Sequence, residues 1–426
     1  MRKMNYQNVR GTQDFLPEQE VVRRTIRRTL EDTFIAYGCK PLETPILNYT
    51  DLMASKYAGG AEILQEMYTL TDRGKRDLAL RYDLTIPFAK VVAMNPTIVM
   101  PFKRYEIGKV FRDGPIKAGR FREFTQCDVD IVGVESQAAE AELMMMAVDA
   151  FKKLDVSIKI QYNNRKLLYG LLQMFEVPEA KMNRVILILD KMEKIERTTL
   201  VKELKELELT EKSLQDIVQF LDAQPTLKYF VPFATENEFV GQGVQELTEL
   251  ADFLSALGIE TQCVFNPFLA RGLEIYTGTI YEIFLADGTI QSSIGSGGRY
   301  DNAIGGLLGT NQSYATVGIS FGLDVIYTAF ELTGATAKRT SDIDIYIIPI
   351  GTEKEALILA TALRSKGYRV EVELSGKKVR KAMDRANREK IKRTIVLGES
   401  EVETNMYKMK EMDSGEEQIV QFVFDR

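Results

Sequence analysis

The chain has 426 residues, of which 45% are hydrophobic and 27% are charged, and its formal net charge is −6. These proportions are typical of a globular protein of two or three domains, and they argue against disorder, a collagen-like repeat and a wholly basic nucleic-acid coat. No apolar run approaches the roughly 18 residues that a membrane span requires, and the first ten residues lack the apolar core of a secretory signal.

Two residue types restrict the chemistry that the chain can perform. Its three cysteines (Cys39, Cys127 and Cys263) are too widely spaced to indicate a metal site or a disulfide framework, so we expect a cytoplasmic protein with no metal ligands of its own. The chain contains no histidine, which removes the commonest general base and metal ligand. Catalysis must then depend on carboxylates, guanidinium groups, tyrosines or the substrate itself.

The first third of the chain predicts one helix followed by strands. Apolar residues recur every four positions and predict an amphipathic helix over 17–37, which Gly38 ends. Alternating β-branched and aromatic residues predict strands over 78–90 and 101–133.

The remainder predicts a helical insertion and a separate terminal domain. Residues from about 164 to 250 are charged and helical in pattern, with a possible N-cap at Thr210. Residues 269–325 return to strands and glycine-rich turns. A small, polar segment at 333–342 marks a boundary, and the alternating strands and helices beyond it predict a small α/β domain.

The most informative polar pattern lies in residues 103–133, which are predicted to form two antiparallel strands. Strand side chains alternate between faces, so one face of the second strand displays a guanidinium, a ring, an amide and two carboxylates: Arg122, Phe124, Gln126, Asp128 and Asp130. The other face displays Cys127, Val129 and Ile131, which suit a core. The polar face favours a binding surface, and a solvated sheet face is the alternative.

Basic residues surround the loop of this hairpin, at about 113–121. Lys117 and Arg120 lie in the loop, and Arg112 and Arg122 lie beside it. Such a loop suits phosphate groups.

Residues 78–90 place Arg81, Asp83 and Thr85 on one face of the predicted strand. A carboxylate beside a hydroxyl suits an ammonium group, although an ion pair with a neighbouring strand is an equally good interpretation.

Arg271 and Tyr276 differ in parity along their segment, so a site shared by both requires the backbone to turn or bulge, as Gly272 permits. The glycine-rich run at 295–301 is neither a dinucleotide fingerprint nor a P-loop, which argues against a Rossmann or P-loop nucleotide site.

Residues 377–393 contain nine Lys and Arg residues against two acidic ones. Such a run is typical of a solvated helix face or of a surface that binds nucleic acid.

Together these segments resemble the histidyl-tRNA synthetases, which are class II aminoacyl-tRNA synthetases. The resemblance covers nearly the whole chain. The opening, motif 1, the substrate strand and motif 2 of the family match VRGTQDFLP, ETPILNYT, LRYDLTIPFAK and KRYEIGKVFRD…GRFREFTQCDVD. ARGLEIYTGTIYE and GSGGRYD resemble the two motifs peculiar to the histidyl enzymes, and ARGLEIY is the most specific of all.

The resemblance implies an α+β fold. A class II antiparallel catalytic sheet flanked by helices would occupy residues 1–333, including the helical insertion, and an α/β anticodon-binding domain would occupy 342–426. It also implies a homodimer that acts on histidine, ATP and histidine tRNA. Mg²⁺ would accompany ATP and be held mainly by the phosphates. Histidine and ATP would give histidyl-adenylate and pyrophosphate, and the histidyl group would then pass to the terminal ribose of the tRNA.

The family pattern also implies roles for individual residues. Asp83, Thr85 and Gln126 would bind the α-amino group of histidine, and Asp130 and Tyr276 would contact its imidazole. Arg112 would hold the α-phosphate, Phe124 would stack on adenine, and Arg271 would contact both the carboxylate and the α-phosphate. Contacts with tRNA would come from Lys117, Arg120, Arg122, Lys378 and Lys381.

Two positions depart from the family pattern. Gly114 replaces the usual motif 2 glutamate, and Val325 replaces the motif 3 arginine that holds ATP phosphates, so Arg299 or another nearby cation is a candidate to compensate. These departures favour the alternative that the chain is a histidine-sensing regulatory subunit. ARGLEIY and the basic terminal domain favour the enzyme.

The absence of histidine from a protein that charges histidine tRNA suggests a further hypothesis. Such a protein could be translated when charged tRNA is scarce. Tryptophan is absent as well, so drift in composition is the alternative explanation.

Overall fold

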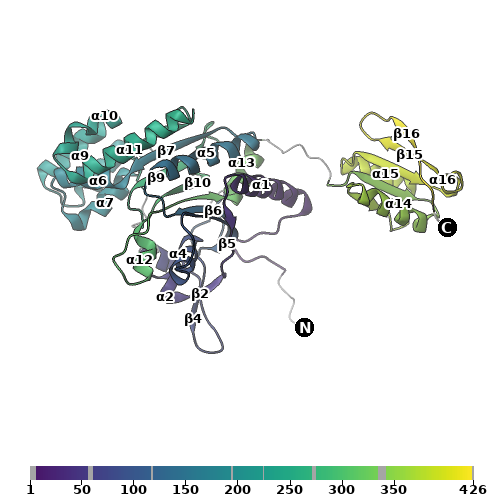
Figure 1. Ribbon diagram of the computed structural model, residues 1–426, viewed down its shortest axis with the longest axis horizontal. Coiled ribbons are helices and arrows are strands. Elements are labelled where there is room, and N and C mark those ends of the chain that lie inside the picture. The colour runs from purple at the N-terminus through teal and green to yellow at the C-terminus, as the bar shows by residue number, and fades with distance from the viewer. Residues whose placement is uncertain are drawn as a thin grey trace. The chain divides into compact units, whose positions relative to one another are not determined.

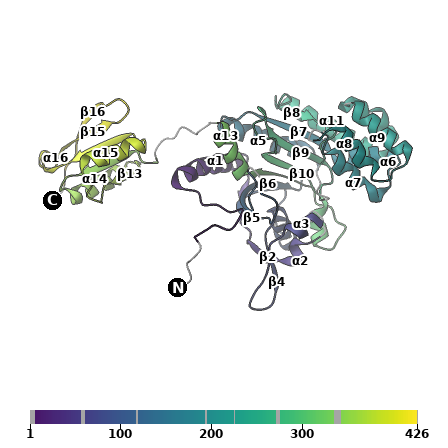
Figure 2. The same ribbon diagram turned by 180° about the vertical axis from the view of Figure 1, so that it is seen from behind.

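The structure is a computed structural model that describes residues 6–55, 61–116, 119–192, 195–223, 225–270, 275–333 and 342–424. The chain divides into two compact units, Met1–Ala335 and Thr336–Arg426. Figures 1 and 2 show their helices and strands from opposite sides.

An eight-stranded sheet forms the centre of the first unit. Its strand order is β1 (Lys40–Pro41), β5 (Phe102–Phe111), β6 (Glu123–Val132), β11 (Thr316–Gly322), β10 (Gly295–Arg299), β9 (Thr279–Leu285), β7 (Ile158–Asn164) and β8 (Cys263–Phe265). Neighbouring strands are antiparallel except for the outer pairs β1–β5 and β7–β8. The predicted α+β fold with an antiparallel sheet flanked by helices is therefore confirmed.

Helices cover one face of this sheet and leave part of the other face to the site described below. The covering helices are α1 (Pro17–Ala36), α5 (Ala138–Lys153), α11 (Glu238–Ala256) and α13 (Leu323–Thr333), whereas α4 (Thr85–Met94) and α12 (Asn302–Leu307) lie on the other side (Figure 1). A three-stranded sheet of β2 (Leu47–Tyr49), β4 (Asp77–Leu80) and β3 (Thr69–Thr71) stands next to α2 (Thr50–Met53), and α3 (Ala61–Glu66) precedes β3 in the chain.

The predicted helix over 17–37 is confirmed as α1. Pro17 stands at its first position and acidic residues occupy its first turn, both of which favour a helix start. The chain leaves the helix through Gly38, whose φ of 77° is the left-handed conformation that glycine adopts without strain. Ile26, Leu30 and Phe34 are fully buried against the sheet.

The hairpin predicted over 103–133 is confirmed as β5 and β6. Cys127, Val129 and Ile131 lie in the core beneath the covering helices, as their alternation predicts. The opposite face of β6, with Gln126, Asp128 and Asp130, is therefore turned away from those helices.

The strand predicted over 78–90 is wrong beyond residue 80. β4 ends at Leu80 and α4 begins at Thr85, because the Asp83 carboxylate accepts hydrogen bonds from the backbone N–H groups of Thr85 and Ile86, both 3.1 Å long. Pro87 fits the first turn of the helix, where its missing N–H has no intrahelical partner. Asp83 and Thr85 thus come together at a helix start rather than on a strand face.

The chain between β7 and β8 is largely helical. Before α11 it contains α6 (Arg165–Met174), α7 (Glu179–Leu189), α8 (Arg197–Lys205), α9 (Glu211–Ala223), α10 (Leu227–Phe230) and a 3₁₀ turn at Pro232–Thr235. The N-cap predicted at Thr210 is confirmed, since its hydroxyl accepts a hydrogen bond of 3.1 Å from the Ser213 N–H.

The second unit is a five-stranded sheet with helices, which confirms the predicted α/β character. Its elements in chain order are β12 (Ile345–Pro349), α14 (Glu353–Ser365), β13 (Val370–Val372), α15 (Val379–Arg388), β14 (Arg393–Leu397), α16 (Glu399–Thr404), β15 (Met406–Glu411) and β16 (Glu417–Gln421). The strand order is β13-β12-β14-β15-β16, and β12 is parallel to both of its neighbours.

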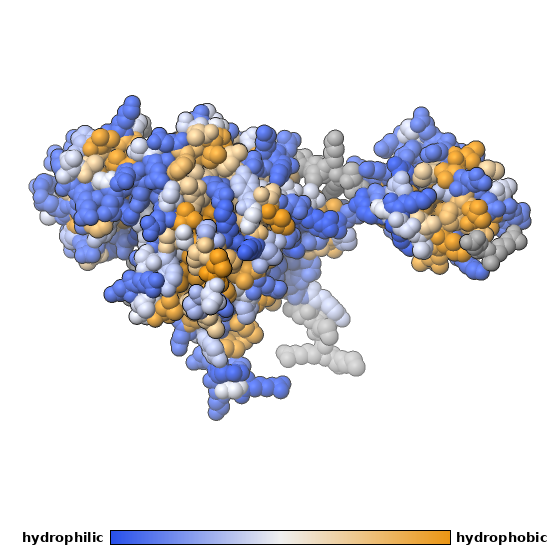
Figure 3. Space-filling model, viewed as in Figure 1, coloured by the Kyte–Doolittle hydropathy of each residue, from blue (hydrophilic) through white to orange (hydrophobic). Residues whose placement is uncertain are grey.

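Part of the surface of the first unit is apolar. Large hydrophobic side chains are exposed on β2 (Leu47 and Tyr49), at the end of α4 (Met94) and in the segment that follows (Val99 and Met100). Figure 3 shows apolar surface over the region of α4 and β2. None of the helices within the described ranges is long and apolar enough to cross a membrane.

Candidate functional site

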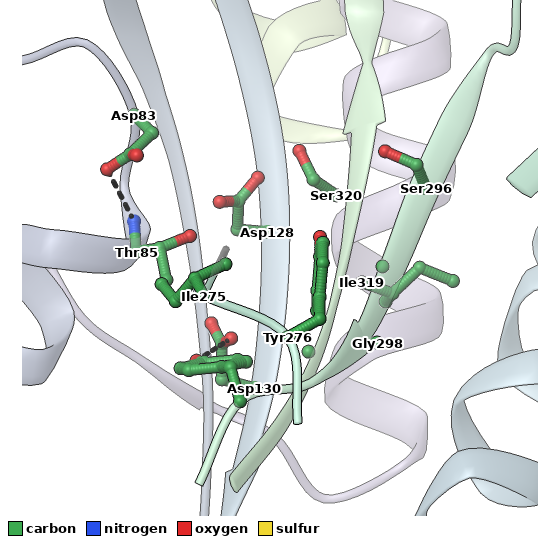
Figure 4. A pocket seen from close by; sticks show the side chains of 13 residues that line it. Asp83, Thr85, Asp128, Asp130, Ile275, Tyr276, Ser296, Gly298, Ile319 and Ser320 are labelled. Carbon is green, nitrogen blue, oxygen red and sulfur yellow. Dashed lines mark hydrogen bonds between the residues drawn. The ribbon is translucent and has the colours of Figure 1, made fainter. Parts of the chain in front are cut away.

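A pocket opens on the face of the large sheet that the covering helices leave free (Figure 4). Three carboxylates (Asp83, Asp128 and Asp130), three hydroxyl-bearing side chains (Thr85, Ser296 and Ser320) and two tyrosines (Tyr276 and Tyr300) line it, together with Ile275, Gly297, Gly298, Gly318 and Ile319. Four of the predicted histidine-binding residues are thereby brought into one site: Asp83, Thr85, Asp130 and Tyr276.

Asp130 is held at the base of the pocket by partners that sequence reasoning missed. The Tyr300 hydroxyl donates a hydrogen bond to its Oδ1, and Nη2 of Arg104 lies 2.6 Å from its Oδ2. Gly318 on β11 stands opposite Asp130, and a Cβ at this glycine would lie 2.0 Å from Oδ1. A side chain at position 318 would therefore displace the Asp130 carboxylate.

Arg104 is fully buried and comes from β5, where it stands directly opposite Asp130. Its guanidinium lies 4.3 Å above the ring of Phe88 on α4 and also approaches Glu106 at 3.8 Å. The hairpin register is the signal that could have identified it, because a loop centred near residue 117 pairs position 104 with position 130.

Burial makes all three pocket carboxyl groups hard to ionise. Desolvation raises the pKa of Asp83 and that of Asp130, although nearby arginines oppose the rise. Desolvation raises the pKa of Asp128 to about 8, opposed by Arg104 and reinforced by the charge of Asp130. A cationic ligand group in the pocket would therefore favour the ionised form of these carboxyl groups.

Gln126 stands at the edge of this pocket. Its amide Nε2 donates a hydrogen bond of 2.9 Å to the hydroxyl of Ser320, which itself lines the pocket. The fifth predicted histidine-binding residue within the described chain is thus linked to the other four.

Two of the three residues predicted to bind ATP, Arg112 and Phe124, lie together. The Arg112 guanidinium lies 5.1 Å from the centre of the Phe124 ring and 4.2 Å from that of Tyr82, and its Nε donates to the Tyr82 carbonyl at 3.2 Å. Arg112 forms no ion pair with any residue that the structure describes, which leaves its charge available for an anion. Phe124 stands on the same strand face as Gln126 and Asp128.

The basic loop of the hairpin is only partly described. Arg120 is exposed, whereas Arg122 pairs with Asp113 at 2.9 Å. Lys117 lies outside the described residues, and so does Arg271.

Other groups of the protein occupy the space around Gly114 and Val325, the two positions that depart from the family pattern. A Cβ at Gly114 would lie 2.7 Å from a carboxylate oxygen of Glu66, so that side chain fills the space beside the loop. Val325 packs against the core, and Gly119 of the loop lies over it in a left-handed conformation with a φ of 70°.

The suggestion that Arg299 compensates for the missing cation is wrong. Its Nε and Nη2 atoms both lie 2.7 Å from oxygens of buried Glu140, and Nη1 donates to the Val134 carbonyl. This guanidinium is already saturated by protein groups.

In the second unit, Lys378 and Lys381 are both exposed, Lys378 at the start of α15 and Lys381 within it. Arg385 of the same helix is held by Glu371 and Glu389, at 2.7 and 2.8 Å. The exposed lysines therefore remain available to an external anion, whereas Arg385 forms ion pairs within the second unit.

No group of three acidic, Cys or His side chains in the described parts of the chain is arranged to hold a metal ion.

Comparisons with known proteins agree with this geometry. The profile of the family described as histidyl-tRNA synthetase matches residues 11–326, and that of the anticodon-binding domain matches residues 344–423. The chain is 60% identical to histidine–tRNA ligase 2 of Shouchella clausii, over the full length of both, and 31% identical to the histidine–tRNA ligase of Pyrococcus furiosus, over 96% of this chain and 95% of that one. The solved histidyl-tRNA synthetase of a Nostoc species has a TM-score of 0.86 and 27% identity, covering 98% of this chain and 97% of that one. The chain belongs to the histidyl-tRNA synthetase family.

Proposed function

We propose that this protein attaches histidine to its tRNA in two steps, through a histidyl-adenylate formed from ATP. The observation that carries the proposal is the juxtaposition of a pocket lined by three carboxylates with Arg112, which directly follows β5, and Phe124 on β6 of the same sheet. The pocket suits the ammonium and imidazole of histidine, and the arginine and ring suit a nucleotide phosphate and base.

In the first step the histidine carboxylate attacks the α-phosphorus of ATP, and pyrophosphate leaves. This carboxylate is already ionised, so no general base is needed and the absence of histidine from the protein does no harm. Negative charge develops on the phosphoryl oxygens, where Arg112 would stabilise it without transferring a proton. Arg271 would act on the same oxygens and on the substrate carboxylate.

In the second step a hydroxyl of the terminal ribose attacks the histidyl carbonyl, and AMP leaves. This hydroxyl must lose a proton, and a phosphate oxygen of the adenylate is the acceptor that we propose. Mg²⁺ would enter with ATP, bound mainly by the phosphates, and would offset their charge.

Two surfaces would meet the tRNA. The motif 2 loop, with Lys117, Arg120 and Arg122, lies in the chain next to Arg112 and would approach the acceptor end. The second unit, with Lys378 and Lys381 exposed on and beside α15, would bind the anticodon region.

The protein would act as a homodimer in the cytoplasm. The exposed apolar side chains on β2 and after α4 supply a surface that a second copy could bury. Replacing both Leu47 and Val99 with Asp should convert a dimer to a monomer in light scattering, and a monomeric wild type would refute the dimer.

The regulatory alternative is less well supported. The chain matches a histidine–tRNA ligase along its whole length and includes an anticodon-binding match. Neighbouring side chains pack around Gly114 and Val325, and the pocket is present despite these two departures.

The test is aminoacylation of total tRNA with each amino acid in turn. We expect histidine alone to be esterified to tRNA in an ATP-dependent reaction. Purified, folded protein that binds histidine but charges no tRNA would overturn the proposal in favour of the regulatory role.

A further inference from the structure

The pocket contains acceptor atoms that its own donors leave unsatisfied. Within the part of the chain that the structure describes, Oδ1 of Asp128 and Oε1 of Gln126 are buried without a hydrogen-bond partner. Both side chains project from the same face of β6, and both adjoin Ser320 of β11. Buried acceptors without donors are uncommon, because burial removes their hydrogen bonds to water and no protein donor replaces them. This pair therefore points to a ligand with several donors.

The arginines near Asp128 form their ion pairs with other carboxylates. Arg104 lies 2.6 Å from Asp130, and Arg81 lies 2.8 Å from Glu106. Asp128 is only 3% exposed, yet it forms no ion pair with a described residue. A ligand group with a positive charge would balance it.

The direction of the side chain identifies the part of the pocket concerned. In Figure 4 the Asp128 carboxyl group projects from its strand into the space bordered by Thr85 and Ser320. The Asp130 carboxyl group lies apart from it, at the hydrogen bond with Tyr300. Asp128 therefore faces the end of the pocket where Asp83 and Thr85 stand, not the end that Asp130 occupies.

We propose that Oδ1 of Asp128 binds the α-ammonium group of histidine, jointly with Oε1 of Gln126 and the carboxylate of Asp83. This assignment rests on the proposed function and adds a residue to it. An ammonium group has three N–H donors, and these three acceptors would receive one each. The two carboxylates also supply the negative charge that holds a cation in a site sheltered from water.

The assignment separates the roles of the two aspartates on β6. Asp130 already accepts a hydrogen bond from Tyr300 and forms an ion pair with Arg104, which fixes it for the imidazole end of the substrate. Asp128 keeps its acceptor free for the amino end. Asp128 is thus a specificity-determining residue that selects ligands with a positively charged amino group.

The experiment compares ligands that do and do not have this group. Dissociation constants are measured by calorimetry, with competition against histidine for weak ligands, for the full chain and for Asp128→Asn and Asp128→Ala. The ligands are histidine, histidinol, which keeps the ammonium and the ring, and imidazolepropionate, which lacks the ammonium. We expect both substitutions to raise the dissociation constants of histidine and histidinol at least tenfold, equivalent to about 1.4 kcal/mol, and to leave that of imidazolepropionate within twofold.

Glu123→Gln is the matched control. Glu123 lies on the same strand but on the opposite face, where it pairs with Lys109 at 3.2 Å, so its loss should not change any of the three constants. Melting temperature reports whether each variant folds.

Each other result contradicts the assignment. Equal losses for histidinol and imidazolepropionate would mean that Asp128 contacts the ring or acts only on the structure. An unchanged constant for histidinol would mean that Asp128 does not touch the ammonium group. Failure of the wild type to bind histidine would instead refute the proposed function. This outcome is distinct from failure of the Asp128 assignment, because it is measured on the wild type alone.

Discussion

At the scale of the single residue, Asp128 shows how a binding group can reduce the stability of the protein that contains it. Its carboxyl group is buried and forms no ion pair with a described residue, and burial raises its pKa from an ordinary value near 3.8 to about 8. The charged groups around it are Arg104 and Glu106 from β5, Asp130 from its own strand and Asp83 from the start of α4.

The sign of the pH effect follows from this shift. Between pH 4 and pH 8 the unfolded chain releases the Asp128 proton while the folded protein retains it, so stability falls as pH rises through this window. Asp128→Asn removes the titration. We expect the variant to melt at a higher temperature than the wild type, by a margin that widens from pH 5 to pH 8 in calorimetric scans without ligand. A margin that stays constant or reverses would show that ionisation of Asp128 does not reduce the stability of the folded protein.

Arg271 is the residue on which the proposed chemistry depends most, and it lies outside the described chain. Arg271→Ala should lower the rate of histidyl-adenylate formation by about 10² to 10³, the usual effect of losing one fixed donor to a developing oxyanion. Single-turnover formation of the adenylate measures this rate, and circular dichroism checks the fold. Full activity in the variant would exclude Arg271 from the reaction.

At the scale of the element, the β5–β6 hairpin and α4 are joined by one buried cation. Arg104 pairs with Asp130 within the hairpin and lies over Phe88 of α4. Arg104→Met should lower the free energy of unfolding by about 3–5 kcal/mol, because it leaves a buried carboxylate unpaired. Urea denaturation provides the measurement, and Arg104→Met combined with Asp130→Leu should recover part of the loss. A single variant as stable as the wild type would show that the pair contributes nothing.

The hairpin and α4 also show what a sequence can and cannot predict. The alternation in β6 is local, so the separation of Asp128 and Asp130 from Cys127 and Val129 was predictable. A strand was expected beyond Leu80 because Leu84 and Ile86 alternate with polar residues. This expectation was wrong, because the backbone N–H groups of Thr85 and Ile86 donate hydrogen bonds to Asp83 and so start a helix there.

Tertiary contacts account for what was missed. The link between Arg104 and Asp130 requires a strand register, and the contact of Tyr300 with Asp130 joins residues 170 positions apart. Gln126 and Ser320 are likewise 194 positions apart. No pattern within one segment contains these pairs. Asp83, Thr85, Asp130 and Tyr276, which the family resemblance assigns to histidine, all line the one pocket.

At the scale of the whole molecule, the division into two units predicts that binding of tRNA and activation of the amino acid can be separated. Lys378→Glu with Lys381→Glu changes charge on and beside an exposed helix of the second unit. We expect at least a tenfold higher KM for tRNA, with a weaker salt dependence, and an unchanged rate of histidine-dependent pyrophosphate exchange. An unchanged KM for tRNA would remove these lysines from the interface.

The absence of histidine concerns the whole chain as well. If it is selected, the protein should be made at an undiminished rate when charged histidine tRNA is scarce. Pulse labelling under severe histidine limitation should show higher synthesis of the natural chain than of a variant with histidine codons at several exposed positions. Equal synthesis of the two would favour drift in composition.

The central claim is that the carboxylate-lined pocket and the adjacent Arg112 activate histidine with ATP. Exchange of labelled pyrophosphate into ATP, measured on the purified wild type with each amino acid in turn, tests this claim without any need for tRNA. We predict exchange that histidine stimulates and that the other amino acids do not. Binding of histidine without any stimulated exchange, or stimulation by a different amino acid, would contradict the account.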